Sequence, residues 1–380
     1  MSYTEQYSTL KNIFNENEAC IDIPESNTSI VNCSFNSRHT FFENTFLKED
    51  SDIQENHSFS YPIFIPKGKK TNNKVIIYLH GLNERSWSKH LYGAQYLADT
   101  TGKSVLLFPL SYHINRGLPE WVNNMEMEKL AEKRSLKYAD LQESSFFNAA
   151  LSERFTDRPE RFFASGFQSA HDIIELSKQI VEGNHPMFEK GTEIDFFAYS
   201  IGCFIIQTLM IAMPDSYFSR SKFVFFAGGS VFSGMNGASR YILDSKAFES
   251  IHHYYTSEIQ TAEARKKEGI VNVLNEQKLG IAFNAMLLPD KLRLLREKVF
   301  TRFQDNTLYL ALQDDLIMPL KDIVSTVGEN VLKSGKIKVI HFDYPYTHEN
   351  PFPVLYKKIS TLVDDAFLKV YQPAAGFLGN

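Results

Sequence analysis

The stretch that decides the fold is 194–213, which reads IDFFAYSIGCFIIQTLMIAM. Its first part, 194–199, is an apolar run typical of a strand buried on both faces of a sheet, and its second part, 202–213, predicts a helix. Ser200 therefore lies on a tight strand-to-helix turn, which pushes a serine hydroxyl out above the sheet. A serine that only caps the helix is the alternative interpretation.

Small residues flank Ser200 at Ala198 and Gly202. The turn brings the backbones of strand and helix close together, so large side chains do not fit there. Gly202 meets this need, and Ala198 stands where glycine is more usual. The free amides at the start of the helix, including that of Ile201, point toward any negative charge that develops beside the serine.

Similar strand-like runs recur on both sides of this turn, with helical segments between them. This alternation predicts parallel βαβ units and helices on both faces of one sheet. The expected fold class is therefore α/β, with a doubly wound, mostly parallel sheet. The strand-like runs lie at 75–79, 104–108, 222–227, 307–311 and 337–342, and the helical segments at 91–100, 202–213, 322–333 and 353–371.

Three stretches depart from the alternation. Residues 1–70 are polar and predict an N-terminal extension ahead of the main domain, 71–380. Residues 112–190 exceed what one connecting helix needs and predict an insertion. Residues 231–306 carry helical segments without a buried strand, and we expect them to form a helical cap over the carboxyl edge of the sheet, where ligands bind in such folds.

Composition and charge bear on the partners and the location that we expect for this protein. Forty basic residues against 45 acidic ones give a net charge of −5, which provides no general attraction to nucleic acid or to an anionic membrane. Three cysteines (Cys20, Cys33 and Cys203) cannot build a disulfide framework. No signal peptide is visible, and the polar residues within 196–213 favour a buried strand and helix over a membrane span. We therefore expect a soluble, cytoplasmic protein with no nucleic-acid partner and no membrane span.

Three other loops follow predicted strands at the same edge as Ser200. After His80-Gly81, the backbone amide of Leu82 is placed to bind an oxyanion. A carboxylate after the strand at 307–311 suits the acid that orients a histidine; Asp315 is the preferred candidate and Asp314 the alternative. His348, after the last strand, can reach back to the serine as a general base.

The chain resembles the α/β-hydrolase superfamily over roughly 70–230 and 305–375, and it is similar to uncharacterised bacterial members of unknown function. The resemblance rests on the His80-Gly81 turn, the Ser200 turn and the loops of Asp315 and His348, in the order Ser, Asp, His. It implies a Ser200–Asp315–His348 triad and an oxyanion hole formed by the amides of Leu82 and Ile201. Leu312 replaces a glycine that commonly precedes the acid, which leaves Asp314 and Asp315 both open.

The expected function is that of a serine hydrolase, carboxylesterase-like, which cleaves an ester, thioester or amide of a small or acyl substrate. No cofactor and no metal is implied, and the oligomeric state stays open. Possible substrate-lining residues are His80, Tyr199, His113 and Arg116, since they lie at or just beyond strand ends on the active edge. The alternative is a non-catalytic binding protein on the same scaffold, because this fold hosts both.

Overall fold

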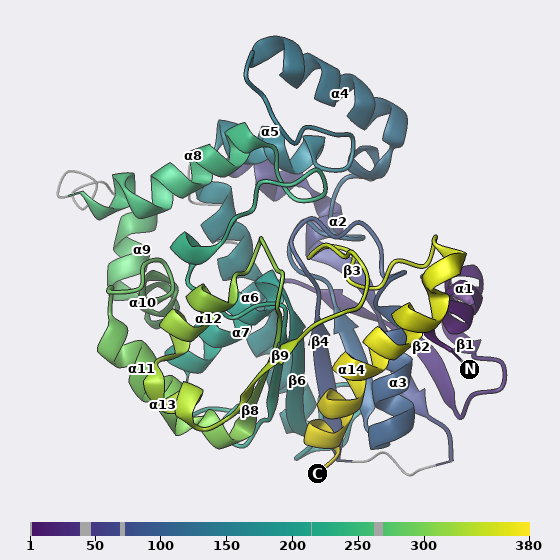
Figure 1. Cartoon of the computed structure of the whole chain (residues 1–380). Coiled ribbons are helices and arrows are strands. Elements are labelled where there is room, and N and C mark those ends of the chain that lie inside the picture. The colour runs from purple at the N-terminus through teal and green to yellow at the C-terminus, as the bar shows by residue number, and fades with distance from the viewer. Residues whose placement is uncertain (1, 39–46, 69–72, 214, 262–268) are drawn as a thin grey trace.

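A single nine-stranded sheet runs through the protein, with helices on both faces (Figure 1). The computed structural model describes residues 2–38, 47–68, 73–213, 215–261 and 269–380. The strand order is β1-β2-β3-β5-β4-β6-β7-β8-β9, and neighbours pair in parallel from β5 onward. This confirms the expected doubly wound, mostly parallel sheet of α/β-hydrolase type. The strands are β1 Cys20–Asp22, β2 Thr28–Asn36, β3 Ser58–Pro66, β4 Lys74–Leu79, β5 Ser104–Phe108, β6 Glu193–Tyr199, β7 Phe223–Phe226, β8 Thr307–Leu312 and β9 Ile337–Ile340.

Strand β4 shows why these runs lack a polar face. Val75 and Ile77 pack into the apolar layer under α6 and α7, whereas Ile76 and Tyr78 pack into the layer under α1, α3 and α14. Successive side chains of a strand point to opposite faces, so a strand covered on both sides must be apolar throughout. The helices that form these layers are α1 Tyr3–Ile13, α3 Leu91–Thr101, α6 Glu160–Glu182, α7 Ile201–Ala212 and α14 Ser360–Gly379.

The N-terminal extension joins the sheet. β1, β2 and β3 pair antiparallel with one another, and β3 pairs with β5, so they continue the main sheet at one edge. Helix α1 begins with a capping box, in which Ser2 and Glu5 satisfy each other's backbone amides. It packs beside α3 and α14, so residues before 71 contribute to the same core.

The two insertions differ in where they pack. Residues 112–190 contain α4 Asn124–Lys137 and α5 Ala149–Asp157 before α6, and α5 packs against α8 Ser245–Thr256 of the second insertion (Figure 1). Within 231–306, helices α10 Lys278–Ala285 and α11 Arg293–Arg302 pack on α7, at the flank of the sheet. Residues 262–268 of the expected cap lie outside the described residues. Other short helices among the described residues are α2 Gln54–His57, α9 Ile270–Glu276, η1 Lys48–Asp52, η2 Pro119–Val122, η3 Phe232–Gly234, η4 Glu258–Gln260, η6 Gln304–Asn306 and η7 Lys357–Ile359.

Two helices differ from their expected ranges. The segment 322–333 forms two helices, α12 Leu320–Val327 and α13 Glu329–Lys333, because Gly328 between them has a φ of +84°. The C-terminal helix α14 begins at Ser360 rather than 353 and continues through Pro373. None of the described helices combines the length and apolar character needed to cross a membrane.

Candidate active site

Ser200 occupies a strained turn between β6 and α7. Its φ of 56° and ψ of −121° lie in a region that non-glycine residues rarely adopt. A Cβ at Gly202 would stand 2.9 Å from Leu79 Cβ and 3.0 Å from the His80 carbonyl oxygen, so the end of β4 leaves room for glycine only. The sequence thus folds into a sharp turn that presents the Ser200 hydroxyl at the carboxyl edge of the sheet.

A continuous hydrogen-bond chain joins Ser200, His348 and Asp315. The Ser200 Oγ lies 2.6 Å from His348 Nε2, and His348 Nδ1 lies 2.8 Å from Asp315 Oδ2. An ionised carboxylate only accepts hydrogen bonds, so Nδ1 carries the proton and Nε2 is free to accept from the serine hydroxyl. All three side chains are almost fully buried. This is the geometry of a nucleophile, its base and the group that orients the base.

Asp315, and not Asp314, meets the histidine. The second Asp315 oxygen accepts from the amides of Ile317 and Met318, each at 2.9 Å. Burial raises the pKa of the Asp315 carboxyl, but the charge and hydrogen bond of His348 and the two amides outweigh burial and hold that pKa below its ordinary value. The Asp314 side chain is more than half exposed and lies 3.4 Å from His341.

The turn after β4 is held by a histidine whose tautomer is fixed. The Leu110 amide donates to His80 Nε2 at 2.9 Å, so Nδ1 carries the proton and donates to the Gly81 carbonyl oxygen at 2.7 Å. That carbonyl and the Leu82 N–H belong to one peptide plane and point in opposite directions. His80 therefore orients the Leu82 amide. Among the described residues, neither the Leu82 nor the Ile201 amide donates to another protein group, which leaves both available to an oxyanion.

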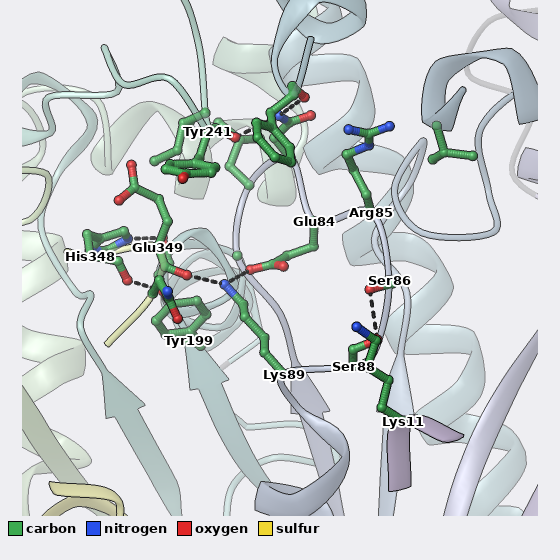
Figure 2. Close-up of a pocket in the computed structure, with 18 of the residues that line it drawn as sticks. Lys11, Glu84, Arg85, Ser86, Ser88, Lys89, Tyr199, Tyr241, His348 and Glu349 are labelled. Atoms are coloured by element: carbon green, nitrogen blue, oxygen red, sulfur yellow. Dashed lines mark hydrogen bonds and ion pairs between the residues drawn. The ribbon is translucent and has the colours of Figure 1, made fainter. Parts of the chain in front are cut away.

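Side chains from the end of β6 and from the segment between β4 and α3 hold the loop that carries His348. The Tyr199 hydroxyl donates to the His348 carbonyl oxygen, and Lys89 Nζ donates to the Glu349 carbonyl oxygen at 2.7 Å. Lys89 also forms an ion pair with Glu84 and lies 4.8 Å from the centre of the Tyr199 ring. Burial opposes the charge of Glu84, but Lys89 and His90 more than compensate and lower its pKa to about 2. Figure 2 shows this network beside the cavity.

A cavity of about 660 Å³ opens above Ser200. This volume is in the range of small-molecule sites. Both insertions reach it, and the Asn83 side chain ties them to the turn by donating to the carbonyl oxygens of Phe147, at 2.9 Å, and Tyr241, at 2.7 Å. The lining residues are Tyr7, Lys11, Gly81, Leu82, Asn83, Glu84, Arg85, Ser86, Ser88, Lys89, Val122, Asn124, Phe147, Tyr199, Ser200, Tyr241, Ile242, His348, Glu349 and Asn350 (Figure 2).

The sequence model of one family, DUF6051, matches residues 39–379. The chain belongs to this family. DUF6051 is described as a family of unknown function, so the match names a family and no chemistry. No curated protein sequence matches the chain.

Solved structures that resemble this DUF6051 chain include three esterases. That of Pyrobaculum calidifontis has 12% identity over 98% of this chain and 91% of its own, with a TM-score of 0.43. A thermostable esterase from Pseudomonas putida ECU1011 has 9% identity over 100% and 89%, with a TM-score of 0.46. The esterase LipW from Mycobacterium marinum has 11% identity over 92% and 82%, also with a TM-score of 0.46. Because these identities and TM-scores are low, the fold assignment rests on the sheet topology described above.

The four residues expected to line a substrate site take different positions. Tyr199 borders the cavity, whereas His80, His113 and Arg116 lie buried outside it. Arg116 pairs with Asp172 at 2.7 Å and donates its other hydrogen bonds to Asn56 and to a backbone carbonyl. A position at or just beyond a strand end does not tell whether a residue borders the cavity or is buried outside it. That depends on which loops cover the residue.

The sequence analysis missed the charged side chains of the cavity. Glu84, Arg85 and Lys89 follow the His80-Gly81 turn within a few residues, and their place after a buried strand was the available signal. Lys11 carried no such signal, since it lies on α1, far in sequence from the other charged residues that line the cavity. Among the described residues, no group of three His, Cys, Asp or Glu side chains forms a potential metal site.

Buried histidines predict acid sensitivity for this DUF6051 member. Burial lowers the pKa of His80 and His90, and it lowers that of His113 and of His185 to about 4. Between about pH 6.5 and 4 the unfolded chain therefore binds protons that the folded chain excludes, so stability is complete above that window and falls with pH through it. We expect a loss of about 1–2 kcal/mol for each such group by pH 5, measured by urea unfolding at pH 7 and pH 5.

A double variant, His113→Gln with His185→Gln, should be less stable at pH 7 but should lose less stability between pH 7 and pH 5. The exposed His253 is the control, because His253→Gln should keep the wild-type difference. An unchanged pH dependence in the double variant would contradict the assignment.

Proposed function

We propose that this protein is a serine hydrolase that cleaves an ester, thioester or amide of a small or acyl substrate. The hydrogen-bond chain from Asp315 through His348 to Ser200 is the observation that supports it. Each of the three residues follows a different strand, yet the chain closes at 2.6 and 2.8 Å. An ion pair that only stabilises a fold does not require an acceptor nitrogen turned toward the hydroxyl of a strained serine.

The reaction proceeds in two halves. Ser200 Oγ attacks the acyl carbon while His348 Nε2 takes the hydroxyl proton, and Asp315 stabilises the resulting imidazolium. The negative charge on the carbonyl oxygen is bound by the amides of Leu82 and Ile201. His348 then gives its proton to the leaving group, which departs as an alcohol, thiol or amine. Water, deprotonated by His348, attacks the acyl-enzyme and releases the acid and Ser200.

A positioning role falls to Tyr199 and Lys89, which hold the loop of the base. The loop 341–356 contains no strand or helix, so its own backbone does not fix His348. Hydrogen bonds to two successive carbonyl oxygens, those of His348 and Glu349, supply the missing constraint. Small displacements of a catalytic group cost large factors in rate, so these bonds contribute to turnover without contacting the reacting atoms.

The second candidate function is that of a non-catalytic binding protein, in which the cavity holds a ligand that is not cleaved. It predicts that the serine does not react with a fluorophosphonate probe, because such probes label activated serines. The complete hydrogen-bond chain favours the hydrolase, since a binding protein needs neither the strain at Ser200 nor the fixed tautomer of His348.

Ser200→Ala should abolish probe labelling and lower kcat/KM for an activated ester by about 10⁴-fold or more, because it deletes the attacking oxygen. Mass spectrometry of the labelled protein and a chromogenic ester assay measure the two effects. Ser88→Ala removes another hydroxyl from the same cavity and should still be labelled. Near wild-type turnover by Ser200→Ala would refute the proposal.

The two neighbouring aspartates form a matched pair. Asp315→Asn places an amide beside His348 Nδ1, which favours the wrong tautomer, and should lower kcat by about 10³–10⁴-fold. Asp314→Asn should change kcat by less than about twofold, since its carboxylate lies near His341 at the surface. Steady-state kinetics at one pH would decide the assignment, and the reverse pattern would transfer the role to Asp314.

Tyr199→Phe should lower kcat by about tenfold with little change in KM, because the base becomes less well placed while the cavity keeps its shape. Tyr344→Phe is the control: its hydroxyl donates to the Pro351 carbonyl oxygen, at 2.7 Å, in the same loop. Both variants should lose about 1 kcal/mol of stability, but only the first should lose turnover. Equal kinetics in the two variants would make the Tyr199 contact merely structural.

A further inference from the structure

Among the described arginines that are at least partly buried, Arg85 alone pairs with neither a carboxylate nor a backbone carbonyl oxygen. Arg116, Arg134, Arg154 and Arg161 each pair with a carboxylate, and Arg296 donates to backbone carbonyl oxygens. Arg85 is partly buried and makes one hydrogen bond, 3.3 Å long, to the neutral amide oxygen of Asn124. Its guanidinium also lies 5.8 Å from the centre of the Phe147 ring. A partly desolvated cation without a counter-ion is costly unless a ligand supplies the opposite charge.

The surroundings of Arg85 keep this charge uncompensated. Glu84, its neighbour, is committed to Lys89, and Glu349 accepts a hydrogen bond from Ser239. Burial lowers the pKa of Arg85, and no carboxylate among the described residues offsets this effect. The cavity holds three cations (Lys11, Arg85, Lys89) and two carboxylates (Glu84, Glu349), which leaves one positive charge.

The positions of these groups suit the far end of a bound substrate. Figure 2 shows Arg85, Ser86, Ser88 and Lys11 across the cavity from His348, with Glu84 and Lys89 between them. Lys11 is exposed and forms no ion pair with another described residue. It belongs to α1, which lies before the part of the chain that the family model matches, so the N-terminal extension adds a cation to this wall of the cavity.

We propose that the cavity selects substrates with a carboxylate at the end remote from the scissile bond, and that Arg85, assisted by Lys11, binds that carboxylate. The proposal rests on the proposed hydrolase function and names its substrate class. One net positive charge matches a monoanion, and the planar guanidinium can hold both oxygens of a carboxylate at once. The apolar side chains of Val122, Phe147 and Tyr241 would cover the chain that joins the carboxylate to the ester.

Two pairs of esters test the proposal, each pair differing only in carboxylate against primary amide. The 4-nitrophenyl monoester of adipic acid and the 4-nitrophenyl ester of adipamic acid, its half-amide, place the group on the acyl side. The pair 4-acetoxybenzoate and 4-acetoxybenzamide places it on the leaving group. The readout is the ratio of kcat/KM, carboxylate over amide, with spontaneous hydrolysis subtracted. We expect one pair to show a ratio above one, and Arg85→Gln to lower that ratio about tenfold.

Arg220→Gln is the matched control. Arg220 is exposed and does not border the cavity, so this variant removes the same charge from the protein without changing the ratio.

Binding of the same esters to Ser200→Ala, followed by calorimetry, tests recognition without turnover. If wild-type protein hydrolyses both members of each pair equally, the anion site is refuted while the hydrolase proposal stands. If no ester is hydrolysed but the carboxylates bind more tightly than the amides in an Arg85-dependent way, the anion site stands and the hydrolase proposal falls. Equal binding of carboxylate and amide to Ser200→Ala would refute the anion site in either case.

Discussion

The position of Ser200 depends on three backbone segments that approach one another more closely than side chains permit. A Cβ at Gly202 would press on the end of β4, and one at Gly228, after β7, would lie 2.6 Å from both the Ser200 carbonyl oxygen and the Cys203 sulfur. At Gly81 a Cβ would stand 3.0 Å from the Tyr199 ring and 3.3 Å from Ser200 Cβ. The serine turn is therefore enclosed by the ends of β4 and β7, and this close packing maintains its strained backbone.

The same packing brings the turn after β4 to Ser200. Because Gly81 lies against Ser200, the peptide between Gly81 and Leu82 reaches the edge where the hydroxyl emerges. His80 then fixes the orientation of that peptide from beneath, buried and without a charge. A histidine at the strand end thus acts through the backbone rather than by contact with a substrate. The sequence showed a histidine at the end of the strand. It did not show that the Leu110 amide contacts the ring and thereby sets the tautomer that orients the Gly81–Leu82 peptide.

The sequence predicted the features that follow from local pattern. Continuous apolar runs gave the strands from β4 onward to within two residues, and the order of Ser200, Asp315 and His348 gave the loops that the structure brings together. The choice between Asp314 and Asp315 was left open, because the sequence does not specify which of two adjacent side chains the loop directs toward His348. Two backbone amides, those of Ile317 and Met318, turn the Asp315 carboxylate inward.

What the sequence did not indicate depends on contacts between distant segments. Lys11 reaches the cavity because α1 packs beside α3 and α14, a contact that joins opposite ends of the chain. Part of 231–306 borders the cavity through Tyr241 and Ile242, whereas α10 and α11 cover the flank of α7. Helices of similar composition can border a cavity or pack against another helix, since an apolar helix face does not specify its partner.

Tyr199 and Ser200, which are adjacent in the chain, both contact His348. Ser200 bonds to the His348 ring, and Tyr199 donates to the His348 carbonyl oxygen while its ring stacks on the imidazole at 5.6 Å. Two adjacent residues at the end of β6 therefore contact both the ring and the backbone of His348. Lys89 extends this coupling to the turn after β4, because it bonds to the loop of the base and to Glu84 at once. The loop of His348 has no secondary structure of its own, and side chains from the end of β6 and from the segment after β4 hold it in place.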